Sequence, residues 1–133
     1  MGKSYFIENE GTIAWYKENT TIFHREDGPA IEYFNGRKEW WQNGKRHREN
    51  GPAIETPAET KFWYQNGKLH RLDGPAVEEI NGTKWWYQNG VLHRTDGPAV
   101  VSHVDGNDYY FLNNIEYPNI KTDEEWIIFQ IIN

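Results

Sequence analysis

Polar and hydrophobic positions alternate along short segments of the chain, and each segment ends at Asn-Gly or at Asp-Gly-Pro. Residues 61–64 form a strand in this pattern, residues 65–68 its turn and residues 69–71 the returning strand. Asn-Gly between aromatic residues is the strongest short-range hairpin signal, because both residues tolerate the positive φ of a type I′ turn. Residues 73–75 then break the strand, since proline has no N–H for a ladder, and residues 76–79 resume an extended run.

The same segment recurs every 23 residues. Each recurrence carries a His-Arg pair that is followed, after two further residues, by Gly-Pro-Ala; the pairs are His24-Arg25, His47-Arg48, His70-Arg71 and His93-Arg94. We divide the chain into copies at about 11–34, 36–58, 60–80 and 82–104 and a partial copy at 106–118. Terminal copies of a stacked array are atypical, because they face solvent or a cap. The repeat therefore predicts a single domain over residues 1–133.

The C-terminal segment differs from the repeats. Thr122 and Glu125 have the spacing of a capping box, so we expect a short helix over about 123–132 that caps the last hairpin. A strand is the alternative, because β-branched Ile127, Ile128, Ile131 and Ile132 favour extended backbone.

Rings occupy both faces of the expected strands, since side chains alternate between faces. One face carries Lys38/Trp40, Lys61/Trp63 and Lys84/Trp86. The other carries Glu39/Trp41, Phe62/Tyr64 and Trp85/Tyr87. The chain has 7 Trp, 8 Tyr and 6 Phe among few aliphatic residues. We therefore expect an all-β, elongated antiparallel meander of stacked hairpins, with a core built largely from rings.

Composition and charge exclude several classes of protein. The 133 residues suit one domain, and the formal net charge of −6 argues against a general nucleic-acid binder. The absence of cysteine excludes disulfides and thiolate metal sites. No apolar run reaches the roughly 18 residues of a membrane span, and residues 1–6 match neither a signal peptide nor a myristoylation site. These features predict a soluble, cytoplasmic protein.

The repeat unit, with its 23-residue step and its Trp-Tyr-x-Asn-Gly-x-x-His-Arg-x-Asp-Gly-Pro-Ala pattern, resembles the MORN repeat over about residues 11–117. It looks closest to a divergent subfamily found in tailed phages and bacteria. The resemblance implies a twisted antiparallel sheet of hairpins and, for a phage protein, the host cytoplasm as its location. Arginine stands in all four His-Arg pairs where the common MORN pattern has a second glycine, so we expect no membrane-lipid contact.

The His-Arg pairs are the first candidates for chemistry. A row of arginines would bind phosphate or carboxylate through paired hydrogen bonds. In the structural interpretation, which we prefer, both side chains bond the Asp-Gly turn and carbonyls of the neighbouring copy, and Asp27, Asp73 and Asp96 lie two residues beyond an arginine. Catalysis needs one asymmetric arrangement rather than four equivalent ones. No carboxylate joins the histidines at metal-ligand spacing, so we expect no metal and no cofactor.

The repeated rings and cations are the second set of candidates. The rings would form either the core or a stacking platform for a base, a sugar or a partner side chain. Lysines two residues before the tryptophans permit cation–π contacts or phosphate binding. The candidate ligand-binding residues are Trp40, Trp63, Trp86, Lys38, Lys61, Lys84, Arg48, Arg71, Arg94, Tyr64 and Tyr87.

No nucleophile elbow, P-loop or His-Glu-x-x-His motif is present, and no catalytic residue is assigned. We expect a non-catalytic binding protein. With the phage resemblance, its role would be to counter host defence by sequestering a signalling nucleotide or by blocking a host protein. One alternative is a structural module that assembles into a homo-oligomer through exposed strand edges and the C-terminal cap. Another is a small hydrolase that uses His and Asp or Glu.

Overall fold

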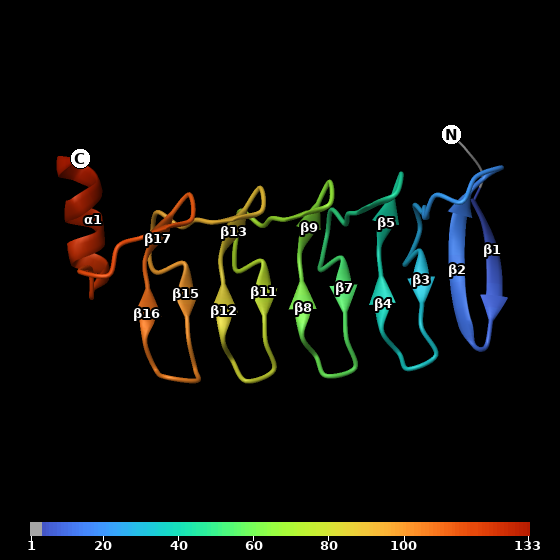
Figure 1. Cartoon of the computed structure of the whole chain (residues 1–133), viewed down its shortest axis with the longest axis horizontal. Coiled ribbons are helices and arrows are strands. Elements are labelled where there is room, and N and C mark those ends of the chain that lie inside the picture. The colour runs from blue at the N-terminus through green and yellow to red at the C-terminus, as the bar shows by residue number, and fades with distance from the viewer. Residues whose placement is uncertain (1–3) are drawn as a thin grey trace. The chain divides into compact units, whose positions relative to one another are not determined.

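The computed structural model describes residues 4–133 (Figure 1). Residues 1–3, half of the N-terminal segment assessed for targeting signals, lie outside the described residues. The chain packs into two compact units, Met1–Lys68 and Leu69–Asn133. Each unit is an antiparallel β meander, and α1 (Asp123–Ile132) is the single α-helix of residues 4–133. The predicted all-β meander with a C-terminal helix is therefore confirmed.

The first unit contains a six-residue hairpin followed by strands of two residues. Its main sheet has the order β1-β2-β3-β4-β7-β8. The bounds are β1 (Ser4–Asn9), β2 (Thr12–Lys17), β3 (Ile31–Glu32), β4 (Lys38–Glu39), β7 (Ile54–Glu55) and β8 (Lys61–Phe62). A separate small hairpin pairs β5 (Trp41–Gln42) with β6 (Lys45–Arg46), and β9 (Tyr64–Gln65) follows β8. β10 (Lys68–Leu69) holds the last residue of this unit and the first of the next.

The second unit repeats this plan and ends in the helix. Its main strands follow in the order β11-β12-β15-β16, and two small hairpins pair β13 with β14 and β17 with β18. The main strands are β11 (Val77–Glu78), β12 (Lys84–Trp85), β15 (Val100–Val101) and β16 (Asp108–Tyr109). The hairpin strands are β13 (Tyr87–Gln88), β14 (Val91–Leu92), β17 (Phe111–Leu112) and β18 (Ile115–Glu116).

The Asn-Gly turns form as predicted, but the strands beside them are shorter. Asn89 and Gly90 have φ of 49° and 81°, as a type I′ turn requires. The expected continuous strand over residues 61–64 is divided at Trp63 into β8 and β9. The equivalent Trp86 shows why. Its N–H donates to Ala99 O, while its carbonyl accepts from His93 N, so the chain leaves the main ladder here and enters the small hairpin.

The repeated part of the core is aliphatic rather than aromatic. Its repeated residues are 0–7% exposed and come from the Ala-Ile or Ala-Val step after each Gly-Pro: Ala30, Ile31, Ala53, Ile54, Ala76, Val77, Ala99 and Val100. The expectation of a core built largely from rings is wrong for these copies, whose tryptophans are half-buried. Full burial of a ring on a sheet face needs a facing layer. Here the rings stack instead on one another and on arginines.

The helix seals the last copy of the second unit (Figure 1). Its capping box at Thr122 and Glu125 is present as predicted. Trp126 is fully buried, packs at a tilt against Tyr110 with a centroid distance of 5.4 Å and donates its indole N–H to Arg94 O at 3.2 Å. Gln130 adds a hydrogen bond to Thr95 O at 2.8 Å. In the fifth copy, α1 thus supplies the contacts that a further repeat would have made.

Candidate functional site

The histidine row links consecutive copies. In each case Nδ1 accepts a hydrogen bond from the backbone N–H of the Asn that begins the turn of the following copy. The pairs are His24 with Asn43, His47 with Asn66, His70 with Asn89 and His93 with Asn113, at 3.0–3.3 Å. The predicted structural role of the histidines holds in kind, but the partner is the Asn-Gly turn, not the Asp-Gly turn or a carbonyl.

The arginine row stiffens the Asp-Gly-Pro corner of its own copy. The Arg94 guanidinium lies 3.9 Å from the ring centroid of Trp86, and its nitrogens donate to Asp96 at 2.8 Å and to Pro98 O at 3.1 Å. A Cβ on Gly97 would lie 3.0 Å from the guanidinium carbon, so an alanine here would require the guanidinium to shift. The predicted contact of arginine with the Asp-Gly turn is therefore present, while the carbonyl that accepts from it belongs to the same copy rather than to a neighbouring one.

Each repeat arginine already has a carboxylate partner. Arg48 pairs with Glu55 at 2.9 Å, and Arg71 pairs with Asp73 at 3.0 Å and Glu78 at 3.3 Å. The corresponding partners of the other two are Asp27 for Arg25 and Asp96 for Arg94. These four guanidiniums therefore have much of their hydrogen-bonding capacity satisfied before any ligand arrives.

The predicted lysines lie beside the arginines, in a cross-strand ladder of alternating charge. Lys38 lies opposite Glu32 and Glu55, Glu55 lies opposite Lys61, and Lys84 lies opposite Glu78. Opposite charges at such positions support strand pairing by about 0.2–1 kcal/mol each. Because Arg48 contacts Trp40 as well as Glu55, the Trp, Arg and Lys candidates share this face.

The remaining candidates divide between the two faces. Trp63 is a half-buried ring in the same register as Trp40. Tyr64 lies on the opposite face, where the Arg46 guanidinium is 5.7 Å from its ring centroid. Tyr87 has the equivalent register in the second unit and is half-buried. The structure therefore does not gather the predicted ligand-binding residues into one site, and their binding role stays a prediction.

The face opposite the lysines carries the largest departure from the repeat. One position per copy holds a ring in copies three, four and five, as Phe62, Trp85 and Tyr109. The same position is Ala14 in copy one and Glu39 in copy two. Ile31 lies directly between these two in the sheet, paired with Ala14 on one side and Glu39 on the other.

Loss of the ring at Ala14 leaves a hollow of about 480 Å³ in the first unit. We call it the Ala14 groove; it is lined by Ile7, Asn9, Glu10, Thr12, Ala14, Tyr16, Phe23, Ile31, Tyr33 and Phe34. Its volume lies within the roughly 300–1,000 Å³ of small-molecule sites. Aromatic and aliphatic side chains dominate the lining, while Asn9, Glu10 and Thr12 place polar atoms along one rim.

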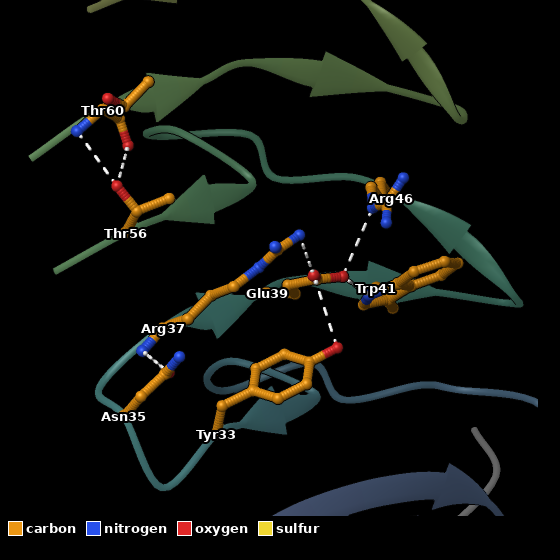
Figure 2. A network of polar contacts seen from close by, with 8 residues as sticks. All are labelled: Tyr33, Asn35, Arg37, Glu39, Trp41, Arg46, Thr56 and Thr60. Atoms are coloured by element: carbon orange, nitrogen blue, oxygen red, sulfur yellow. Dashed lines mark hydrogen bonds and ion pairs between the residues drawn. The ribbon is translucent and has the colours of Figure 1, made fainter. Parts of the chain in front are cut away.

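Glu39 forms the centre of a charged cluster beside this groove (Figure 2). Although it is 1% exposed, its carboxylate accepts from Arg37 Nη2 at 2.5 Å, Trp41 Nε1 at 2.9 Å and Arg46 Nε at 3.3 Å. The Tyr33 hydroxyl lies 3.5 Å from its Oε1. Two guanidiniums against one carboxylate give this cluster a net positive charge within an acidic chain.

The groove and the Glu39 cluster share walls. Tyr33 lines the groove with its ring and faces Glu39 with its hydroxyl. Phe23 lines the groove and packs 5.4 Å from Trp41, over which the Arg46 guanidinium lies at 4.9 Å. Burial, and then the negative charge of Glu39, raises the pKa of Tyr33. The phenol therefore stays neutral and can donate a hydrogen bond.

A second hollow of about 410 Å³ lies in the second unit, where the incomplete fifth copy lacks its Asp-Gly-Pro-Ala segment. Its rim includes Asp108, Glu116 and Lys121, together with Tyr109, whose hydroxyl donates to Asp105. That bond, with a backbone bond from Asn107, lowers the pKa of Asp105 to about 2. This hollow is polar and mostly acidic, unlike the Ala14 groove.

Sequence reasoning missed Ala14, Tyr33, Arg37 and Arg46 as site residues. The available signal was the departure of copies one and two from the ring position, which alignment of the copies displays. In residues 4–133 no group of three or more His, Asp or Glu side chains is arranged to hold a metal ion. The same residues include no helix that is long and apolar enough to span a membrane.

Comparison with known proteins gave no match: no family model fits the chain, and neither a curated protein nor a solved structure is similar to it.

Proposed function

We propose that the protein is a non-catalytic binding protein whose site is the Ala14 groove. The observation that supports this proposal is the replacement of a repeated ring by Ala14, because the groove beside it is lined by Tyr16, Phe23 and Tyr33 and has room for a further ring. A flat heterocycle would occupy this space, as the rings of Phe62, Trp85 and Tyr109 occupy the equivalent position in the other copies. Base–aromatic stacking is worth about 1–3 kcal/mol per base.

The lining residues favour binding over catalysis. Glu10 is the one carboxylate among them, and the lining includes no histidine, lysine or serine. General acid–base chemistry needs a proton donor or acceptor within hydrogen-bond reach of the reacting group, and usually a partner that orients it. The role in countering host defence, by removing a signalling nucleotide from solution or by blocking a host protein, is the cellular form of this proposal.

The substitution Ala14→Phe tests the proposal, because it restores the ring found at Phe62 and fills the groove. Isothermal titration with nucleosides and nucleotides should show binding to the wild type and a loss of at least about tenfold in Ala14→Phe. Ala58→Phe, on an exposed turn of the same unit, is the matched control and should bind as the wild type does. Equal affinity in Ala14→Phe, or no binding of any member of the panel, would contradict the proposal.

The first strand favours a second candidate function, self-assembly. β1 is the edge of the first unit's sheet, and Phe6 and Ile7 on it are 55% and 52% exposed. An exposed edge strand pairs readily with another strand, and two copies of β1 would meet antiparallel about a two-fold axis. Light scattering should then show dimers that Ile7→Lys dissociates. A monomer at every concentration would contradict this candidate.

A further inference from the structure

We infer that the Ala14 groove and the Glu39 cluster form one two-part site for a nucleotide, in which the groove holds the base and Arg37 with Arg46 holds the phosphate. This inference rests on the proposed function and adds the residues that hold the phosphate. It follows from four observations: the arginine donors, the local charge, the shared walls and the polar rim.

The donors of Arg37 and Arg46 are less fully used than those of the repeat arginines. Within residues 4–133, Arg46 makes its one side-chain hydrogen bond through Nε, which leaves both terminal nitrogens free. Arg37 bonds Glu39 through Nη2, and its Nε is buried without a hydrogen-bond partner among the described residues. The two side chains are 39% and 35% exposed, so an anion from solvent can reach them.

Glu39 holds the two arginines in place without cancelling their charge. Its carboxylate lies against both guanidiniums, and the Trp41 indole N–H fixes the second oxygen. The Arg46 guanidinium is also flanked by rings, 4.9 Å from Trp41 and 5.7 Å from Tyr64. A preorganised guanidinium loses less conformational entropy when it binds phosphate, and its planar fork matches phosphate geometry.

This arrangement is specific to the second copy. In the third copy, Thr60, Phe62 and Leu69 stand where the second has Arg37, Glu39 and Arg46, and Thr56 takes the place of Tyr33. Figure 2 shows the contrast: the Thr56 hydroxyl bonds the backbone N–H and carbonyl of Thr60 in the region where the second copy builds its charged network. The third copy therefore forms the same repeat structure without a charged network, so the network in the second copy is not needed for the fold of a repeat.

The polar rim favours a nucleobase over an aromatic side chain of a partner protein. Asn9, Glu10 and Thr12 offer hydrogen-bonding atoms at the edge of the groove. A base presents donors and acceptors on its edge, whereas phenylalanine presents none. Because Tyr33 lines the groove and also faces Glu39, a ligand that leaves the groove along Tyr33 reaches the arginines directly.

Three probes separate the two parts of the site: adenosine, adenosine diphosphate and inorganic pyrophosphate. The test variant is the triple substitution Arg37→Thr, Glu39→Phe and Arg46→Leu, which gives the second copy the residues of the third. It removes one net positive charge, so Lys68→Gln, an exposed lysine of the same unit, is the control matched for charge. Circular dichroism and a urea titration establish that each variant is folded before binding is measured.

We expect the wild type and Lys68→Gln to bind adenosine diphosphate at least about tenfold more tightly than adenosine. The triple variant should lose this preference while its affinity for adenosine stays within about twofold of the wild-type value. Ala14→Phe should lower the affinity for both adenosine and adenosine diphosphate. Pyrophosphate should compete with adenosine diphosphate for the wild type but not for the triple variant.

Two outcomes would overturn the inference. If adenosine binds and the diphosphate binds no better, or if the preference survives in the triple variant, the arginines do not hold the anion, while the groove remains a binding site. If neither compound binds but a phenylalanine- or tryptophan-containing peptide does, the nucleotide assignment is wrong and the groove serves a protein partner.

Discussion

The first and second units share one frame but differ on one face. In both units, a histidine accepts a hydrogen bond from the turn of the next copy; His24 with Asn43 in the first unit is an example. In both, an arginine also lies over a tryptophan ring, as Arg94 lies over Trp86 in the second unit. On the opposite face, the second unit fills the ring position with Trp85 and Tyr109. The first unit has Ala14 and Glu39 there, besides Phe62.

This difference shows how a repeat protein separates stability from function. The frame contacts involve the backbone, buried alanines and the Gly-Pro corner, which the copies share. The ring position lies on the opposite face and takes no part in these shared contacts. The residue there can therefore change while the shared contacts are kept. Function in such a chain is expected at departures from the repeat rather than in the repeat itself.

The largest effect on stability is expected at the ends of the two units, which also differ from each other. Trp126 of α1 is fully buried, whereas Phe6 on the first strand is 55% exposed. Trp126→Ala should lower the free energy of unfolding of the second unit by about 3–5 kcal/mol, because the cavity lies between Tyr110, Tyr117 and Phe129. Hydrogen exchange resolved by residue gives the stability of each unit.

Phe6→Ala is the matched truncation in the first unit and should cost less than about 1 kcal/mol. Equal losses at the two ends would contradict the view that the second unit is sealed and the first is open.

The next test asks whether the frame is equivalent in both units. A Cβ at Gly51 or at Gly97 would lie 3.0 Å from the guanidinium carbon of Arg48 or Arg94. Each Gly→Ala substitution should therefore cost about 1–3 kcal/mol in urea unfolding, as overpacking does, and the two costs should agree. In a double-mutant cycle with Arg94→Ala, the cost of Gly97→Ala should fall, since the clash is removed. Strict additivity would exclude the arginine as its cause.

A smaller effect is expected where the units differ. Glu39→Gln keeps the shape of the side chain but leaves Arg37 and Arg46 without their carboxylate. Because both arginines are more than one-third exposed, water replaces part of the lost interaction, and the cost should be about 1–2 kcal/mol. Glu55→Gln, which removes the exposed partner of Arg48, should cost less than about 1 kcal/mol. A larger loss of stability in Glu55→Gln than in Glu39→Gln would contradict the prediction that the carboxylate of Glu39 contributes more to stability than that of Glu55.

Much of this fold could be predicted from the sequence, because local chemistry determines it. Asn-Gly specifies the tight turns, Gly-Pro breaks the strands and the capping box begins α1 at Asp123. The aliphatic core could not be predicted from composition, which is dominated by rings. Burial depends on which residues neighbouring copies cover, and Ala53 is covered because its N–H and C=O both bond adjacent strands, at Phe62 and Trp40.

The candidate site was harder to predict because it is defined by exceptions. The repeated Trp, Lys and Arg residues drew attention by their number, yet repetition marks what the frame needs. Glu39 gives only part of a local signal as a buried carboxylate, since Arg37 and Trp41 share its face at a spacing of two residues, whereas Arg46 reaches it only through the fold. Ala14 carries no chemistry of its own, and its importance is the absence of a ring.

The smallest expected effect appears at alkaline pH and belongs to the sealed unit. Tyr110 is 2% exposed and donates to Asp123 at 2.8 Å; burial first, and then this carboxylate, raises its pKa above the ordinary value of about 10. Above pH 10 the unfolded chain releases a proton that the folded chain keeps. The unfolded state then binds fewer protons, so the free energy of unfolding falls as the pH rises.

Tyr110→Phe should therefore make this alkaline decline shallower, while at neutral pH it costs only the hydrogen bond, about 1 kcal/mol. Urea titrations from pH 8 to pH 12, with phenolate absorbance as a second readout, measure the slope for both proteins. Tyr33→Phe is the comparison in the first unit, since burial and Glu39 also raise the pKa of Tyr33. If the slope followed Tyr33 and not Tyr110, the proton would be held more firmly beside the open groove than under the helix, and the second unit would not be the sealed one.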